Sequence, residues 1–188
     1  MSILRIYNVY MKVHPSAREV DNLAIQVRLC QESDLATLNQ TIISHGDWHR
    51  KRFETQQRDE AAYLVAWEGE VPVGHLYLTW GGSDQVEVQQ HLQACPELSA
   101  IWVWPAEKRS LGIGKKLIAQ AEELVRSRGY ARVGLGVGVA NERARELYER
   151  LGYKDWGYGI NNNHYTNFKA DGTPVEHVNP RHYLLKEL

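Results

Sequence analysis

A strand that runs through a glycine-rich turn into an amphipathic helix is the feature that most limits the folds open to this chain. "LSAIWVW" (98–104) is rich in β-branched and aromatic residues and is stopped by Pro105. "KRSLGIGKKL" (108–117) follows, and its two glycines permit a tight turn. A helix that begins at such a turn directs backbone N–H groups and the positive end of its dipole at an anion. The sequence therefore predicts an anion-binding turn between a strand and a helix.

The two helices that follow this turn have clear sequence signals. Apolar residues from Ile113 to Val125 recur on one helical face, and Gly129 is typical of a helix end. Asn141 is a helix-capping residue, and Gly152 closes the second apolar-periodic stretch. Between them "ARVGLGVGV" (131–139) alternates apolar residues with glycine, so one face of that strand is bare backbone, open to close approach by another element or a ligand.

The remaining periodicities predict an α+β layout with a mixed sheet. The expected order is strand, two helices, three strands, helix, strand, helix and two strands. The other elements are a strand at 24–29, helices starting at Ser33 and at Asp47, a hairpin at 62–80, a loop at 81–96, a hairpin about Asp171-Gly172 and a last strand at 182–188.

Size and charge limit the class of protein. We expect one domain at 23–188, preceded by an N-terminal extension at 1–22 that could include a strand at 3–13. A formal net charge of −1 gives no overall basic field for nucleic acid or membrane, so neither is an expected partner. Two cysteines without metal spacing and no apolar run of membrane length favour a cytoplasmic protein.

The turn does not match the two common nucleotide motifs. A dinucleotide fingerprint G-x-G-x-x-G requires a third glycine or alanine where Leu117 stands. A P-loop requires glycine at Arg109 and a magnesium-binding hydroxyl at Lys116. What remains is R-x-x-G-x-G, which suits a pyrophosphate held without a metal or, alternatively, a turn surrounded by solvated lysines.

Two further motifs, in order and spacing with this turn, resolve that choice. Val103 to Pro105 forms a V-x-P strand end, and Arg109, Gly112 and Gly114 form R-x-x-G-x-G. "NERARELYERLGY" (141–153) matches N-x-x-A-x-x-x-Y-x-x-x-G-[FY]. Together they resemble the GNAT superfamily of acyl-CoA-dependent N-acyltransferases. The resemblance implies a three-layer α/β/α fold, with a mixed, mostly antiparallel sheet of about seven strands, a V-shaped splay, and helices on both faces.

The same resemblance implies an enzyme that moves an acetyl group from acetyl-CoA to an amine in a ternary complex, without a metal. It places the cofactor on the exposed main chain of the strand before the turn, on the turn itself and on the helix that follows. The implied cofactor-binding residues are Ile101, Trp102, Val103, Arg109, Ser110, Leu111, Gly112, Ile113, Gly114, Lys115, Asn141 and Arg145. Ser110 departs from the glycine that many members carry.

Acyl transfer to an amine needs a neutral amine, a stabilised oxyanion and a protonated leaving thiolate, because an alkylamine with a pKa of about 10.4 is charged at neutral pH. The resemblance implies the Val103 N–H as oxyanion donor, Tyr148 as general acid and Glu97 as base, acting directly or through water. Two of these have another interpretation: Tyr148 as a packed core residue, and Glu97 as an exposed acid after Pro96. Asn141 could both cap its helix and contact the cofactor. Trp102 and Trp104 could pack on the sheet or line the substrate cleft.

The acceptor is not specified by these motifs. Acidic residues in the 81–97 region suit a cationic amine, and the segment at 157–181 lies where such proteins shape their acceptor cleft or the contact of a homodimer. A non-catalytic acyl-CoA sensor or assembly module with the same fold is the alternative function. His45 and His49 have metal-ligand spacing, but Gly46 and Asp47 indicate a helix boundary there, so no metal site is expected.

Overall fold

In the computed structural model, which describes residues 24–42, 47–168 and 173–188, seven strands form one sheet in the order β1-β2-β3-β4-β5-β7-β6. Neighbouring strands pair antiparallel, except that β4 and β5 pair parallel. The mixed, mostly antiparallel sheet expected from the sequence is confirmed. The strands are β1 (Ile25–Leu29), β2 (Ala61–Glu68), β3 (Val71–Thr79), β4 (Glu97–Val103), β5 (Arg132–Gly138), β6 (Lys154–Phe168) and β7 (Pro174–Glu187).

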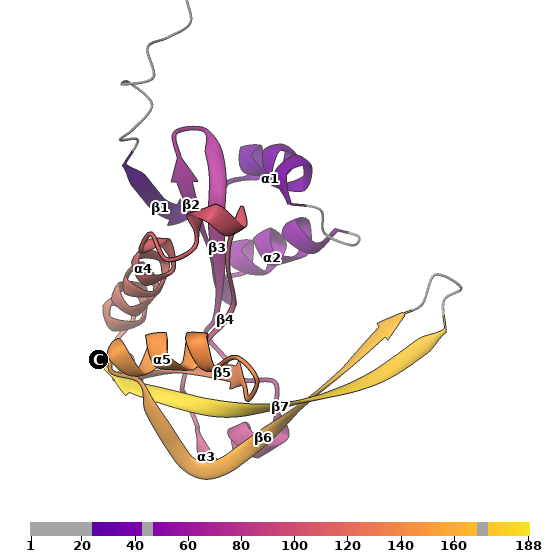
Figure 1. Cartoon of the computed structure of the whole chain (residues 1–188), viewed down its shortest axis with the longest axis vertical. Helices are drawn as coiled ribbons and strands as arrows, with labels where there is room; N and C mark the ends of the chain where they lie inside the picture. Colours follow the sequence, from indigo (N-terminus) through magenta and orange to yellow (C-terminus); the bar gives the residue numbers. More distant parts are fainter. Residues whose placement is uncertain (1–23, 43–46, 169–172) are drawn as a thin grey trace, which may run out of the picture.

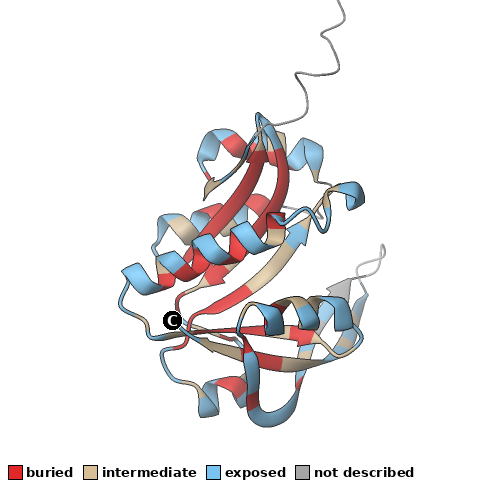
Figure 2. Cartoon of the chain, turned by 60° about the vertical axis from the view of Figure 1, so that its left-hand side comes forward, coloured by how far each residue is buried: buried red, intermediate tan, exposed pale blue. Residues whose placement is uncertain are grey.

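Helices cover both faces of the sheet (Figure 1). On one face lie α4 (Ile113–Ser127) and α5 (Glu142–Arg150), whose apolar side chains join the largest buried cluster. On the other face α1 (Leu35–Thr41) and α2 (Trp48–Gln57) pack against β2, and α3 (Val86–His91) packs near β6 and β7. Because strand residues alternate between faces, Tyr63 faces α2 while Leu64 faces α4. Buried residues are concentrated on the central strands between these layers (Figure 2).

The sheet opens between β4 and β5. These strands pair only at Glu97 with Gly134 and Leu98 with Leu135. Beyond Leu98 the β3–β4 register shifts, since Tyr77 pairs with Ser99 but His75 pairs with Trp102. One extra residue therefore bulges from β4, and Ala100 adopts a φ of 47° there. The bulge and the lost pairing leave an open edge on β4 from Ile101 onward, which forms the expected splay.

The sequence predicted the element order with two corrections. The 81–96 region is not wholly a loop, because it contains the short helix α3, whose one buried side chain gives too little periodicity to predict it. The helix expected from Ser33 begins instead with a 3-10 turn, η1 (Glu32–Asp34), and becomes α-helical at Leu35. Gly129 and Gly152 end their helices with positive φ, as predicted.

The glycine-lined face of β5 is approached by another element. A Cβ added at Gly136 would lie 2.7 Å from the Arg181 side chain, and one at Gly134 would lie 2.7 Å from Tyr183 Cε1. Both side chains come from β7, which pairs with β5. Glycine is therefore required on this face because β7 side chains cross it.

Three expectations fall on residues outside the described ranges. They concern the extension at 1–22 with its strand at 3–13, the Asp171-Gly172 turn and the His45 ring. The strands on either side of that turn do pair, from Phe168 with Pro174 inward. Among the described helices, none is long and apolar enough to cross a membrane.

Candidate active site

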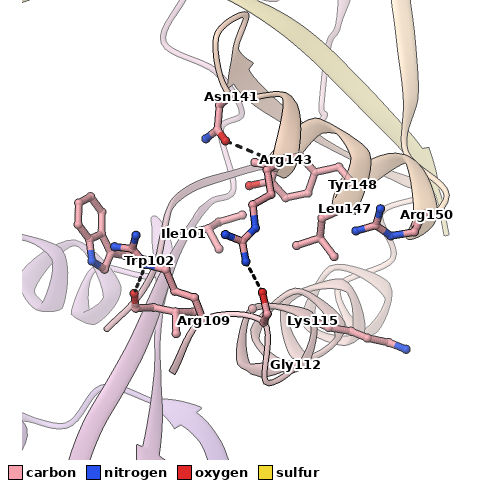
Figure 3. A pocket seen from close by; sticks show the side chains of 14 residues that line it. Ile101, Trp102, Arg109, Gly112, Lys115, Asn141, Arg143, Leu147, Tyr148 and Arg150 are labelled. Carbon is pink, nitrogen blue, oxygen red and sulfur yellow. Dashed lines mark hydrogen bonds between the residues drawn. The ribbon is translucent and has the colours of Figure 1, made fainter. Parts of the chain in front are cut away.

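A cavity of about 600 Å³ lies between the open edge of β4, the glycine turn and α5 (Figure 3). Its lining draws on each motif that the sequence singled out. The lining residues are Ile101, Trp102, Val103, Arg109, Ser110, Gly112, Gly114, Lys115, Asn141, Arg143, Ala144, Leu147, Tyr148 and Arg150. The structure thus brings together residues from β4, from the turn and from two helices.

The turn has the backbone conformation that its glycines permit. Gly112 has a φ of 84°, and a Cβ built on it would meet nothing within 4 Å. Ser110 is also left-handed, with a φ of 66°, a conformation that favours glycine. The first intrahelical hydrogen bond of α4 runs from the Lys116 N–H to the Gly112 carbonyl at 3.0 Å. The preceding N–H groups of the turn and of the first helical residues are therefore available to a ligand.

The lining of the cavity is cationic. Arg109, Lys115, Arg143 and Arg150 contribute to it, and none of the lining residues is acidic. Arg143 donates a hydrogen bond to the Ser110 hydroxyl and so links α5 to the turn (Figure 3). By contrast, Lys108 lies 2.7 Å from Glu68 and is not among the lining residues. This local charge in a chain of net charge −1 matches a polyanionic ligand.

The main chain of β4 is directed alternately toward β3 and toward the opening. The Trp104 N–H donates to the Val73 carbonyl of β3 at 3.1 Å. Because adjacent strand residues point their amides to opposite edges, the amide of Val103 is directed to the open edge. The Val103 carbonyl there accepts a hydrogen bond of 3.2 Å from Arg109 Nε. The Val103 N–H accordingly lies on the edge that faces the cavity.

Tyr148 lies on the cavity side of α5 and is 9% exposed. Its hydroxyl is directed toward the β4 side of the cavity, where Ile101 lies (Figure 3). Burial raises the pKa of Tyr148 to about 12, so the hydroxyl keeps its proton at neutral pH. Its ring also packs in the core cluster, so the two interpretations of Tyr148 are compatible.

Asn141 caps α5 and lines the cavity. Its Oδ1 accepts a hydrogen bond of 3.3 Å from the Ala144 N–H, which leaves the amide nitrogen for other partners. Three of the predicted cofactor-binding side chains do not line the cavity. Leu111 is exposed, Ile113 is buried in the core, and Arg145 bonds Glu149 and His182, each at 2.9 Å.

Glu97 lies at the start of β4, outside the cavity lining, and is 6% exposed. Its Oε2 accepts a hydrogen bond of 3.1 Å from the Tyr183 hydroxyl, and Arg181 lies 3.8 Å from its Oε1. Burial raises the pKa of Glu97, opposed by hydrogen bonds from Ser83 and Tyr183 and by the Arg181 charge. The acid is therefore not exposed, as one interpretation of the sequence had it, but belongs to a buried polar network.

The two tryptophans of this region differ. Trp102 is exposed at the cavity edge, with the Arg109 guanidinium 5.9 Å from its ring. Trp104 packs on His75, with ring centroids 5.4 Å apart. The cavity also contains Arg143, Ala144, Leu147 and Arg150, which were not among the predicted site residues. Arg143, Leu147 and Arg150 are spaced four and three residues apart and so share one face of α5, which is the signal that could have found them.

In the described part of the chain, no three His, Cys, Asp or Glu side chains are grouped to hold a metal ion. His49 instead faces the core, where its Nδ1 lies 2.7 Å from the Tyr63 hydroxyl.

Comparisons with known proteins agree with this geometry. Residues 31–153 match the acetyltransferase (GNAT) family. An uncharacterized N-acetyltransferase of Methanocaldococcus jannaschii is 34% identical over 109 residues, which are 57% of this chain and 46% of that protein. The chain thus spans about half the length of this curated relative.

Solved structures share the fold. A putative acetyltransferase of Salmonella typhimurium with its cofactor acetyl-CoA has a TM-score of 0.63 and 17% identity, over 88% of this chain and 94% of that one. An N-acetyltransferase of Thermoplasma acidophilum in complex with coenzyme A has a TM-score of 0.58 and 16% identity, over 88% and 99% of the two chains. Since the family match covers four of the seven strands, the turn and both cavity-forming helices, this chain belongs to the GNAT family of acetyltransferases.

Proposed function

We propose that the chain transfers an acetyl group from acetyl-CoA to a primary amine of a small molecule or peptide, by direct attack within a ternary complex. The observation that carries this proposal is the single cavity in which the glycine turn, the open edge of β4 and Tyr148 meet. The acetyl-CoA complex of the Salmonella relative, which has the same fold, supports the choice of donor.

The residues of the cavity fit coenzyme A. The pyrophosphate would bind the N–H groups at the start of α4, between Ser110 and Lys115, with Arg109 and Arg143 beside it. The pantetheine arm would lie along the main chain of Ile101, Trp102 and Val103, with the Asn141 amide close to it. The cofactor supplies an acetyl thioester, whose carbonyl would then face the open edge of β4.

Val103 would stabilise the oxyanion. Its N–H is directed to the open edge and would donate to the thioester oxygen as negative charge develops there. A preorganised backbone donor of this kind is worth about 3–4 kcal/mol in other acyl transfers. The bulge at Ala100 supports this role, since it turns the following main chain out of regular pairing.

Tyr148 and Glu97 would move the protons. Glu97, which lies outside the cavity lining, would accept one proton from the acceptor ammonium through water, and the neutral amine nitrogen then bonds the acetyl carbon. The carbon–sulfur bond breaks as Tyr148 donates its proton to the sulfur, and the second proton of the attacking nitrogen then passes to the Tyr148 oxygen, which restores the hydroxyl and leaves a neutral amide. The high pKa of Tyr148 keeps that proton available, and the raised pKa of Glu97 makes its carboxylate a stronger base than an exposed one.

A thiol-release assay tests the proposal, because each transfer frees one coenzyme A thiol and leaves one acetylated amine. The competing function, a sensor or assembly module that binds acyl-CoA without turnover, predicts binding but no release with any amine.

A further inference from the structure

A partly buried arginine without an ion-pair partner stands on the face of the sheet opposite α4. The guanidinium carbon of Arg52, on α2, lies 3.3 Å from the centroid of the Trp48 ring and 4.9 Å from that of Tyr77. Its Nε is buried and has no hydrogen-bond partner among the described residues. Aromatic faces attract a guanidinium but do not replace the hydrogen bonds that it gave up to water.

Other arginines show how unusual this position is. Most arginines of the described ranges lie within 4.0 Å of a carboxylate, as Arg28 does at 2.6 Å from Asp34. Arg109, Arg132 and Arg143 have no such partner among the described residues either; Arg132 donates to the Gln93 carbonyl at 3.3 Å, whereas Arg109 and Arg143 line the cavity that suits a polyanion. Arg52 shares their lack of a carboxylate, which points to a second place where an anion completes the site.

Arg52 belongs to a group of aromatic side chains joined by ring contacts, here called the Arg52 cluster. Its members are Trp48, Arg52, His75, Tyr77 and Trp104. The His75 ring lies 4.9 Å from that of Trp48 and 5.4 Å from that of Trp104. His75 Nδ1 and Trp104 Nε1 are both buried without a partner in the described part of the chain. Burial lowers the pKa of Arg52 to about 10 and that of His75 to about 3, so Arg52 is the cluster's one cation at neutral pH.

The cluster borders the segment of β4 proposed for the thioester. In the β3–β4 ladder, Tyr77 pairs with Ser99 and His75 pairs with Trp102, on either side of the bulge. Because adjacent strands lie about 4.8 Å apart, the backbones of His75 and Tyr77 lie one strand spacing from β4. An acceptor that reaches the open edge of β4 from the α2 side of the sheet would pass the cluster.

We infer that the Arg52 cluster binds a carboxylate of the acceptor, so that the acceptor is an amino acid or another amine that carries a carboxylate. The inference rests on the proposed function, because it names the substrate class of that reaction. Arg52 would donate charge-assisted hydrogen bonds from its guanidinium fork, the geometry that best matches a carboxylate. Trp104 would add a neutral donor, its Nε1–H, which is buried without a partner in the described part of the chain.

Matched acceptors test this inference. The thiol-release assay would compare glycine, γ-aminobutyrate and ε-aminocaproate, each with its carboxamide, which keeps the size and removes the negative charge. We expect kcat/KM for at least one acid to exceed that of its amide by about 10- to 100-fold. Arg52→Met should bring this ratio close to 1 with little effect on the amide, and Arg52→Lys should restore part of it.

Arg50→Met is the matched control, because Arg50 lies on the same helix, is half exposed and stands 3.8 Å from Glu32. It should leave the acid-to-amide ratio unchanged. Amides that react as well as the acids, or a ratio that survives Arg52→Met in a protein that still binds acetyl-CoA, would overturn the inference while the proposed function stands.

A second measurement separates the two proposals when turnover is absent. Calorimetric titration of the best acid into the coenzyme A complex should show binding that Arg52→Met weakens by about 10-fold. Such binding without any thiol release would contradict the transfer reaction but retain the carboxylate site. Equal binding by Arg52→Met and the unmodified protein would exclude the site.

Discussion

The Tyr183 hydroxyl donates a hydrogen bond of 3.1 Å to Glu97 Oε2, although the two residues are 86 positions apart in the chain. This contact ties the start of β4 to β7 and fixes the carboxylate three residues before the bulge. The proposed base is thus oriented by the same strand whose side chains cover the glycine face of β5.

Glu97→Gln should lower kcat by about 100-fold or more, because a positioned general base contributes 10²–10⁴. The reaction needs ionised Glu97, so activity should rise with pH through its raised pKa. Tyr183→Phe removes a hydrogen bond that favours the ionised form and should shift this acidic limb to higher pH. Unchanged kcat and pH profile in Glu97→Gln would show that Glu97 has only a structural role.

Tyr148→Phe should lower kcat by about 10- to 100-fold and leave acetyl-CoA binding nearly unchanged, because it removes only the proton donor. Single-turnover kinetics and calorimetry measure the two effects. Tyr153→Phe is the control, since its buried hydroxyl bonds Glu122 at 3.0 Å and does not line the cavity. That variant should lose stability and keep its kcat. An unaltered kcat in Tyr148→Phe would remove the residue from the mechanism.

Gly112→Asp should abolish acetyl-CoA binding. The built Cβ at Gly112 meets no protein atom within 4 Å, so the added side chain would occupy open space at the turn and repel the pyrophosphate. Gly112→Asn is the control, because asparagine has similar bulk and also tolerates the φ of 84°. We expect the asparagine variant to bind more weakly than the unmodified protein but more tightly than the aspartate variant. Tight binding by Gly112→Asp would refute the pyrophosphate site.

Buried His75 should make the fold sensitive to acid. Burial and the nearby His49 and Arg52 charges lower its pKa from 6.5 to about 3. Between pH 6.5 and about pH 3, His75 is protonated in the unfolded chain but stays neutral in the folded chain. The free energy of unfolding therefore decreases as the pH falls, by at most about 1.4 kcal/mol per pH unit.

His75→Asn should therefore flatten the dependence of the unfolding free energy on pH below 6.5. Denaturant titrations at several pH values measure the slope. His91→Asn, which changes an exposed histidine of α3, should leave the slope as it is. If the unfolding free energy of His75→Asn changed with pH as steeply as that of the unmodified protein, His75 would not be the source of the acid sensitivity.

The sequence was sufficient to predict helix faces, helix ends and helix caps, because each of these depends on residues close together in the chain. The apolar face of α4, its end at Gly129 and the Asn141 cap each depend on residues within a few positions of one another. The glycine turn is local in the same sense, and its R-x-x-G-x-G pattern together with the family resemblance predicts a pyrophosphate site.

The rest depends on contacts between distant segments. The bulge of β4 occurs at Ala100, a residue with no preference for positive φ, because the β3 and β5 pairings impose it. Arg145 is on α5, which lines the cavity, but its side chain forms hydrogen bonds with Glu149 and His182 and is not part of the lining. The Arg52 cluster joins α2, β3 and the end of β4, and no spacing along the chain links these elements.

The measurement that most directly tests acetyl transfer is the release of coenzyme A thiol from acetyl-CoA with a panel of amines, with the product identified by mass. We expect at least one amine to give one acetylated product per thiol released, and Tyr148→Phe to slow both equally. Tight binding of acetyl-CoA with no thiol release for any amine would contradict the proposed acetyl transfer and favour an acyl-CoA sensor.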